Sequence, residues 1–314
     1  MAVTELEVLT CAQTWLRDGH PVMLATVVDT WGSAPRRAGA QMVVRQDGTF
    51  LGSVSGGCIE GAVIQNAMEA TSDGRLLTFG VSIEDAWAVG LSCGGEISVW
   101  LEPLTLETVD ALYSAIQERR AIGLKLSLQS DVPMRIIEDV NEIMVMSKSI
   151  RQTDGTAVVV YQPMRRLFIV GAVHIAQALV PMARQVGYQV VIMDPRSIFL
   201  NDERWGNVER ISDFPEEYLS NVNLGSRDAV VALSHNPTFD DEALYLALQR
   251  DVFYIGALGS RRNHAKRCIR LQERGLLPEQ VARISGPVGL DIQAQTPAEI
   301  AVSILAEMIQ CQTV

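Results

Sequence analysis

The chain has 314 residues, a length typical of about two domains, and 48% of them are hydrophobic. The formal net charge of −11 argues against a general nucleic-acid-binding protein. No apolar run of about 20 residues predicts a membrane span, and the N-terminal residues do not have the pattern of a signal peptide. Five widely spaced cysteines indicate reduced thiols in a cytoplasmic protein.

Residues 1–103 are predicted to form a small α+β domain. Apolar residues at helical spacing predict a helix over 4–17, and a strand follows at 21–30. The dipeptide Asp47-Gly48 between two alternating stretches is typical of a β-hairpin. The stretch "SGGCIEGAVIQNAMEA" then predicts a loop leading into a helix, and "LLTFGV" and "EISVWLEP" predict two further strands.

Residues 104–164 are predicted to be a connector with a helix over 105–119 and two or three short strands. From residue 165 to residue 314, strand-like and helix-like stretches alternate. This alternation predicts an α/β domain with a Rossmann-like, doubly wound parallel sheet. The chain would then end in a helix that begins with a capping box formed by Thr296 and Glu299. The strands expected here are 167–171, 189–193, 208–211, 229–234, 253–258 and 283–287.

The carboxyl ends of these parallel strands are where such a fold binds ligands. The candidate cofactor-binding residues at these ends are Gly171, His174, Asp194, His235, Ser260 and Arg261. Gly171 and Ala176 match the first and third positions of a dinucleotide fingerprint, but Val173 replaces its middle glycine. We therefore expect NAD to bind weakly. The alternative for Asp194 is a turn cap before Pro195, and the two histidines could simply form local hydrogen bonds.

The N-terminal domain contains two loops with matching elements, "SVSGGCIEGAV" and "GLSCGGEISV". Glycine amides at a helix start can bind an anion, and a cysteine there becomes a better nucleophile or soft-metal ligand. The alternative is that the glycines form tight turns and the cysteines are small buried side chains. The candidate residues of this region are Arg36, Arg37, Gly56, Gly57, Cys58, Cys93 and Gly94.

These motifs resemble the xanthine dehydrogenase accessory factor family of the XdhC/CoxI type. Its N-terminal domain is similar to "GSAPRRAGAQMVV", "GSVSGGCIEGAV" and "GLSCGGEISVWLEP". Its C-terminal Rossmann domain is similar to "VGAVHIAQAL", "VVIMDPR", "VVALSHNPTFDDEAL", "YIGALGSRR" and "GPVGLDIQAQTPAEIAVSILAEM". The chain departs from the family pattern at Val173 and Gln293, where the family usually or often has glycine.

The resemblance implies a chaperone for the molybdenum cofactor rather than an enzyme that turns over a substrate. Members of the family help the cofactor acquire a terminal sulfido ligand and pass it to an apo molybdenum hydroxylase. From the chemistry of the cofactor we infer that Arg36, Arg37 and the amides of Gly56 and Gly57 bind its phosphate. Cys58 and Cys93 are candidates for contact with molybdenum or the transferred sulfur. The sequence leaves open whether the cofactor is molybdopterin or its cytosine dinucleotide.

Two other functions remain open at this stage. An NAD(P)-dependent oxidoreductase would use Asp194 and the parallel sheet, whereas a non-catalytic adaptor would use its Rossmann domain only for docking. The expected partners are the apo hydroxylase and a cysteine desulfurase, and we expect a homodimer that binds neither nucleic acid nor a membrane.

Overall fold

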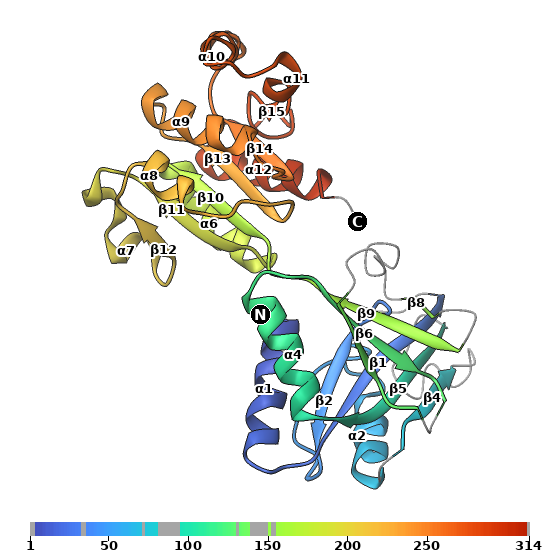
Figure 1. Cartoon of the computed structure of the whole chain (residues 1–314). Coiled ribbons are helices and arrows are strands. Elements are labelled where there is room, and N and C mark those ends of the chain that lie inside the picture. The colour runs from blue at the N-terminus through green and yellow to red at the C-terminus, as the bar shows by residue number, and fades with distance from the viewer. Residues whose placement is uncertain are drawn as a thin grey trace. The chain divides into compact units, whose positions relative to one another are not determined.

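The computed structural model of the chain describes residues 4–32, 36–70, 73–80, 95–129, 132–138, 150–151 and 155–312. The chain forms two compact units, residues 1–163 and residues 164–314 (Figure 1). The segment 104–164, expected to be a connector, provides a helix and strands that pack within the first unit.

The first unit is built from two antiparallel sheets and three described helices. The five-stranded sheet has the order β3-β2-β1-β5-β4, and the four-stranded sheet has the order β7-β6-β9-β8. In chain order the elements are α1 (Glu5–Arg17), β1 (Val22–Gly32), β2 (Gln41–Arg45), β3 (Phe50–Gly52), α2 (Glu60–Glu69), β4 (Arg75–Gly80), β5 (Gly95–Leu104), α4 (Leu106–Gln117), β6 (Ile122–Ser127), β7 (Arg135–Ile137), β8 (Ile150–Arg151) and β9 (Thr156–Tyr161).

Strand β1 separates the two apolar layers of this unit. Successive side chains of a strand point to opposite faces of its sheet. Met23 and Ala25 therefore face α2, whereas Val22 and Leu24 face α1, α4 and the four-stranded sheet. The predicted hairpin is present, and its turn places Gly48 at a φ of 86°, a conformation that favours glycine.

The second unit is an α/β fold around a parallel sheet. All of its described strand pairs are parallel, and the sheet has the order β12-β11-β10-β13-β14-β15. In chain order the elements are β10 (Arg166–Val170), α6 (His174–Gln185), β11 (Gln189–Met193), the 3-10 turn η1 (Ser197–Leu200), α7 (Asp202–Trp205), β12 (Glu209–Ile211), α8 (Pro215–Ser220), β13 (Asp228–Ala232), α9 (Pro237–Leu248), β14 (Tyr254–Ala257), α10 (Arg261–Glu273), α11 (Pro278–Val281), β15 (Ile284–Ser285) and α12 (Pro297–Gln310).

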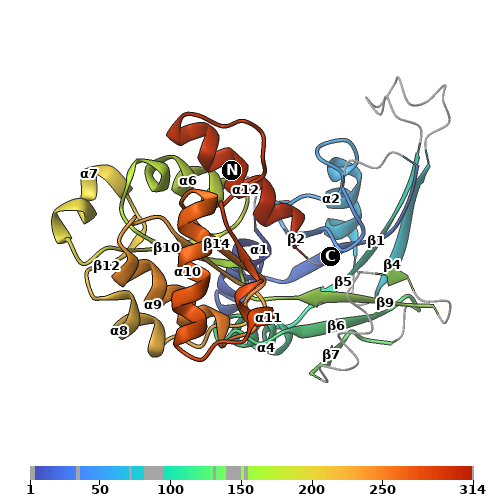
Figure 2. The ribbon, with the colours of Figure 1, turned by 90° about the horizontal axis from the view of Figure 1, so that it is seen from above.

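Helices cover both faces of this sheet (Figure 2). Helices α6 and α12 pack on one face, and α8, α9 and α10 pack on the other. The strand order reverses between β10 and β13, so the loops that follow these two strands define the switch point where such folds bind ligands. The predicted fold class is confirmed, as is the capping box of Thr296 and Glu299 at the start of α12.

None of the described helices is both long enough and apolar enough to cross a membrane.

Candidate functional site

The loop after β3 is folded around the side chain of Glu60, the first residue of α2. Glu60 is 8% exposed, and its carboxylate accepts hydrogen bonds from two serine hydroxyls and four consecutive backbone amides. The donors to Oε1 are Ser53 Oγ at 2.7 Å and the amides of Val54, Ser55 and Gly56 at 3.2, 2.9 and 3.0 Å. The donors to Oε2 are Ser55 Oγ at 2.5 Å and the amide of Gly57 at 2.9 Å.

These hydrogen bonds keep Glu60 charged. Burial by itself would raise the pKa of Glu60, but the bonds from Ser55, Ser53 and the backbone outweigh it and lower the pKa to about 2. The expectation that the Gly56 and Gly57 amides bind a phosphate therefore needs correction. Both amides already donate to Glu60, so an external anion would have to displace that carboxylate.

The same loop holds the backbone of Cys58. Ser55 Oγ accepts hydrogen bonds from the amides of Cys58 and Ile59, both at 3.0 Å. Gly56 and Gly57 have φ angles of 85° and 123°, which explains why two consecutive glycines stand at the exposed tip of the loop. Cys58 itself is half-buried and packs partly against the apolar core beside α2.

The segment 36–40, which contains Arg36 and Arg37, enters the sheet at the same end at which the loop that carries Cys58 leaves it. Met42 of β2 pairs with Gly52 of β3, and the amide of Ser53 donates to the carbonyl of Gln41. Arg36 is half-buried and Arg37 is exposed, and both precede β2. Cys93 and Gly94 lie outside the described residues, so the joint role of Cys58 and Cys93 stays a prediction.

At the switch point of the second unit, the loops after β10 and β13 touch each other. A Cβ atom at Gly171 would lie 2.6 Å from both the Cα and the backbone nitrogen of Ser234, and Gly171 has a φ of 105°. Glycine is therefore required there by space and by conformation. Val173 is the N-cap of α6, without a side-chain capping bond, and packs partly against the core.

Asp194 is buried at the end of β11, and its carboxylate is fully engaged within the chain. It accepts the amide of Ala172 at 2.9 Å, the amide of Arg196 at 3.0 Å, and two guanidinium bonds from Arg196 at 2.9 and 2.8 Å. Burial raises the pKa of Asp194, but these bonds outweigh burial and lower it below its ordinary value. The alternative of a turn cap thus describes its contacts better than a free ribose acceptor.

The remaining predicted residues of the second unit follow β10, β13 and β14. His174 begins α6 and His235 follows β13, and both are exposed. His235 has a φ of 60°, an uncommon conformation for a residue other than glycine. Ser260 caps α10 by accepting the amide of Asn263 at 3.2 Å. The side chain of Arg261 is 86% exposed and lies 3.9 Å from Asp291.

Comparisons with known proteins connect both units to one family. Residues 15–80 match the XdhC and CoxI family, and residues 167–308 match the XdhC Rossmann domain. The chain is 30% identical to the molybdenum cofactor insertion chaperone PaoD of Escherichia coli, over 93% of this chain and 84% of PaoD. The chain belongs to the XdhC and CoxI family.

Further relatives of this XdhC/CoxI-family chain carry different names. It is 29% identical to a Bacillus subtilis protein named as a probable subunit of xanthine dehydrogenase, over 94% of each chain. A crystal structure from Bacillus halodurans, described as a xanthine dehydrogenase, has a TM-score of 0.78 and 28% identity. That match covers 98% of this chain and 96% of the other, so the likeness includes both units.

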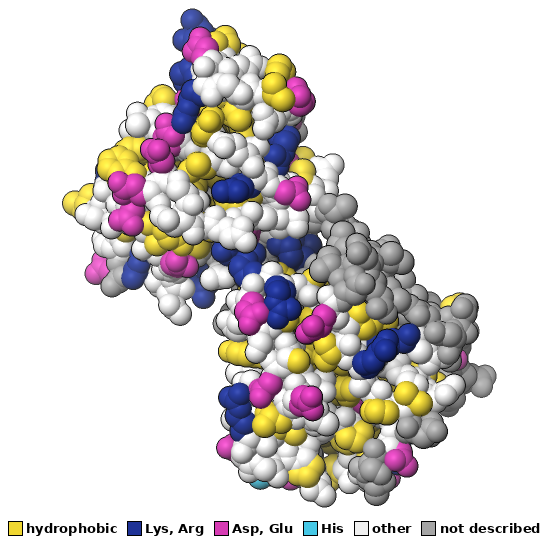
Figure 3. Space-filling model, viewed as in Figure 1, with side chains coloured by type: hydrophobic (Ala, Val, Ile, Leu, Met, Phe, Trp, Pro, Cys, Tyr) yellow, Lys and Arg dark blue, Asp and Glu magenta, His cyan; other side chains and the backbone are white. Residues whose placement is uncertain are grey.

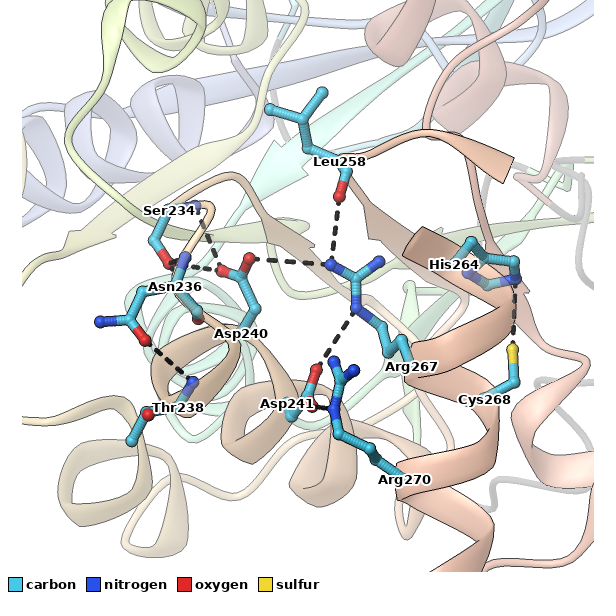
Figure 4. Close-up of polar contacts among 10 residues, drawn as sticks. All are labelled: Ser234, Asn236, Thr238, Asp240, Asp241, Leu258, His264, Arg267, Cys268 and Arg270. Carbon is cyan, nitrogen blue, oxygen red and sulfur yellow. Dashed lines mark hydrogen bonds and ion pairs between the residues drawn. The ribbon is translucent and has the colours of Figure 1, made fainter. Parts of the chain in front are cut away.

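The XdhC/CoxI-family chain also contains a buried charged cluster behind its switch point (Figure 4). Asp240 of α9 accepts the amide and the hydroxyl of Ser234 at 3.1 and 2.7 Å. Arg267 of α10 donates to the carbonyl of Leu258 at 3.1 Å and lies 3.8 Å from Asp240 and 3.4 Å from Asp241. Arg267 therefore joins the loops that follow β13 and β14.

The sequence alone did not indicate Glu60 or this buried cluster. Burial raises the pKa of Asp240 more than the bonds from Ser234 and the charge of Arg267 lower it. The available signal was an acidic pair in "PTFDDEAL" and a strongly basic helix in "RRNHAKRCIR", which sequence alone would assign to solvent-facing surfaces. Within the described residues, no group of three or more histidine, cysteine or acidic side chains is arranged to hold a metal ion.

Charged side chains are interspersed on the face shown in Figure 3. Among the described residues there, basic groups alternate with acidic and apolar ones rather than forming one broad positive surface. That distribution agrees with the acidic net charge of −11.

Proposed function

We propose that this chain is an insertion chaperone that carries the molybdenum cofactor to an apo hydroxylase of the xanthine dehydrogenase type. The observation that carries the proposal is the likeness to PaoD, which extends through both units. The names of the other relatives support a xanthine dehydrogenase-type enzyme as the partner.

The first unit provides groups that suit this cargo. The cofactor presents a phosphate and a molybdenum centre bound by sulfur, so it calls for a cationic group and a soft ligand. Arg36 and Arg37 are the cations in the loop before β2, and Cys58 is a half-buried thiol in the loop after β3. We assign the phosphate to the arginines, because the Gly56 and Gly57 amides are engaged by Glu60.

The finer parts of the proposal concern sulfur, partners and cellular location. Cys58, with Cys93, is the candidate for contact with molybdenum or for accepting sulfur from a cysteine desulfurase. The chaperone would act in the cytoplasm as a homodimer and release the cofactor, as molybdopterin or its cytosine dinucleotide, to the hydroxylase. The switch-point residues Gly171, His174, Asp194, His235, Ser260 and Arg261 are candidates for a nucleotide portion.

The test is to co-express the chain with a molybdenum-cofactor pathway and to measure bound molybdenum and pterin after purification. We expect both to co-purify with the chain, and the loaded protein to activate an apo hydroxylase of the xanthine dehydrogenase type. Cys58→Ala should lower loading while the protein stays folded, because a half-buried thiol contributes little to packing. Cys268→Ala, in α10 of the second unit, is the matched control. Absence of pterin together with failure to activate the hydroxylase would contradict the proposal.

A permanent component of the hydroxylase is the second function, favoured by the name of the Bacillus subtilis relative. A chaperone releases its partner after transfer, whereas a permanent component stays with the mature enzyme in fixed proportion. Size-exclusion chromatography of the activated hydroxylase separates these outcomes.

A further inference from the structure

The carboxylate of Glu60 reaches away from its own helix. A glutamate at a helix start ordinarily accepts amides of the first turn or of the capping residue. The four amides that donate to Glu60 belong instead to residues 54–57, all of which precede α2. The side chain therefore organises the loop between β3 and α2 rather than the end of the helix.

The charge of Glu60 is balanced by dipoles and not by a cation. Within the described part of the chain, no arginine or lysine forms an ion pair with it. Consecutive backbone N–H groups that converge on one point form a concave anion site. In this protein the occupant of that site is a carboxylate of the chain itself, which is 8% exposed.

The contacts extend from Glu60 to Cys58 through Ser55. The Ser55 hydroxyl donates to Glu60 Oε2 at 2.5 Å and accepts the amide of Cys58 at 3.0 Å. Ser53 holds the tip of the loop in the same way, since its hydroxyl donates to Glu60 and accepts the amide of Gly56 at 2.9 Å. Removing the carboxylate takes their common acceptor from four amides and two hydroxyls, and the Gly56 amide keeps only Ser53 Oγ, so the closed loop loses most of the hydrogen bonds that hold it.

We propose that Glu60 is a positioning residue, an internal anion that holds the loop 53–59 closed and thereby sets the exposure and orientation of the Cys58 thiol. The functional importance of that orientation rests on the proposed function, in which Cys58 contacts the cargo. The closed loop itself is a property of the protein alone and is measured without molybdenum.

The first experiment compares the alkylation rate of each cysteine by iodoacetamide, read by peptide mass spectrometry, in the wild type, Glu60→Gln and Glu60→Ala. We expect Cys58 to react about fivefold faster or more in both variants, because the loop opens locally. Cys268 and Cys311, both in the second unit, should react at unchanged rates. Glu299→Gln is the matched control, since Glu299 also accepts backbone amides at a helix start but contacts no part of this loop.

The second experiment asks whether an external carboxylate replaces the missing one. Formate at tens of millimolar should return the Cys58 alkylation rate of Glu60→Ala toward the wild-type value and leave Glu60→Gln unchanged, because glutamine still fills the space. A conservative Glu60→Asp variant should keep most of the protection. If Glu60→Ala does not fold, the same comparison is made between Glu60→Asp and the wild type, with a partial rise in the rate expected.

The inference is overturned if Cys58 reacts at the wild-type rate in folded Glu60→Gln, or if formate has no effect on Glu60→Ala. Bound molybdenum and pterin are measured in parallel. A wild type that carries no cargo contradicts the proposed function but leaves the alkylation result valid. A wild type that carries cargo, with unchanged alkylation in both variants, contradicts only the role of Glu60.

Discussion

In both units, the place where a sequence motif indicates a ligand is occupied by contacts within the chain. The two units differ in whether the motif provides the hydrogen-bond donors or the carboxylate. In the first unit, the glycine-rich loop provides backbone amides as hydrogen-bond donors, and the carboxylate of Glu60 accepts them. In the second unit, the strand end provides the carboxylate of Asp194, which accepts hydrogen bonds from the amide of Ala172 and the guanidinium of Arg196. The Gly56 and Gly57 amides and the Asp194 carboxylate, all expected to bind a ligand, thus already bind another part of the chain.

The difference lies in what balances the negative charge. Glu60 depends on hydroxyl and amide dipoles, whereas Asp194 and Asp240 lie beside arginines. The amide dipoles point at Glu60 only in the present backbone conformation of the loop 53–59, so opening the loop removes the interactions that balance the charge of Glu60. In the second unit, Arg267 of α10 lies beside Asp240 of α9, and Asp194 accepts the amide of Ala172 from the loop after β10, so separate elements are joined. Rigidity therefore has a local origin in the first unit and a long-range origin in the second.

Removing a cation from the second unit should produce the largest loss of stability. Arg267→Met leaves Asp240, which is 1% exposed, without its nearby positive charge. Breaking a buried pair by removing one partner costs roughly 3–5 kcal/mol. Urea unfolding, with peptide-level hydrogen exchange over residues 228–248, measures the loss and assigns it to the second unit.

The control for that change is Arg270→Met. Arg270 pairs with Asp241 at 2.6 Å, but its side chain is 41% exposed, so the free energy of unfolding should fall by about 1 kcal/mol or less. Equal losses for the two variants would mean that burial does not distinguish the two arginines. The double variant Asp240→Asn, Arg267→Met should recover part of the lost stability, because the uncompensated charge of Asp240 is gone and Asp241 still pairs with Arg270.

Glu102 of β5 is a buried carboxyl group that has neither the ring of amide and hydroxyl donors found around Glu60 nor an arginine ion pair like that of Asp194 among the described residues. It is 4% exposed, and its Oε1 has no hydrogen-bond partner among the described residues. Burial raises the pKa of Glu102 to about 7. The folded state thus holds a proton, between the ordinary pKa of 4.5 and about 7, that the unfolded state has released.

The stability of the first unit should therefore fall as pH rises from 4.5 to about 7 and change little above that range. At 1.36 kcal/mol for each pKa unit, the loss is on the order of 3 kcal/mol. Glu102→Gln should remove this dependence, as measured by urea unfolding at a series of pH values. Glu96→Gln, an exposed position on the same strand, should keep it. An unchanged slope in Glu102→Gln would contradict the assignment.

Glu60 should act in the opposite direction and in a separate pH range. Its pKa is lowered to about 2, so the stability it provides is present above the ordinary value of 4.5 and is lost as pH falls through about 2. The pH dependence of stability caused by Glu102 therefore lies above pH 4.5 and that caused by Glu60 lies below it, so one titration separates them.

The sequence was sufficient to predict the framework because the framework follows from local patterns. Parallel strands such as β10 and β13 are buried on both faces and read as continuous apolar runs. The caps at Ser260 and Thr296 lie within three residues of their partners, so a short motif contains the whole interaction.

The occupants of the candidate sites could not be predicted in the same way. The position of Glu60 inside the loop depends on positive φ angles at Gly56 and Gly57, and these angles define a concave shape that letters do not display. Arg267 is buried only because α9 and the loop after β14 come together around it, although its own helix is strongly basic. Proximity across elements, rather than spacing along the chain, decides both contacts.

The smallest effect concerns the nucleotide affinity of the second unit. Val173 stands where a dinucleotide fingerprint has glycine, and Asp194 is held by Arg196, so NAD should bind the wild type only at millimolar concentration. Val173→Gly makes room for one or two amide bonds to a pyrophosphate and should raise the affinity by about tenfold, measured by calorimetry. Arg196→Ala alone removes two of the four hydrogen bonds to Asp194 but leaves the two amide bonds and Val173 in place, so it should have less effect. The double variant should exceed both, because the two obstacles lie on different strands' loops. Micromolar affinity in the wild type would show that a ligand displaces the internal hydrogen-bond partners of Asp194. The two units would then differ in whether a ligand can replace the contacts within the chain.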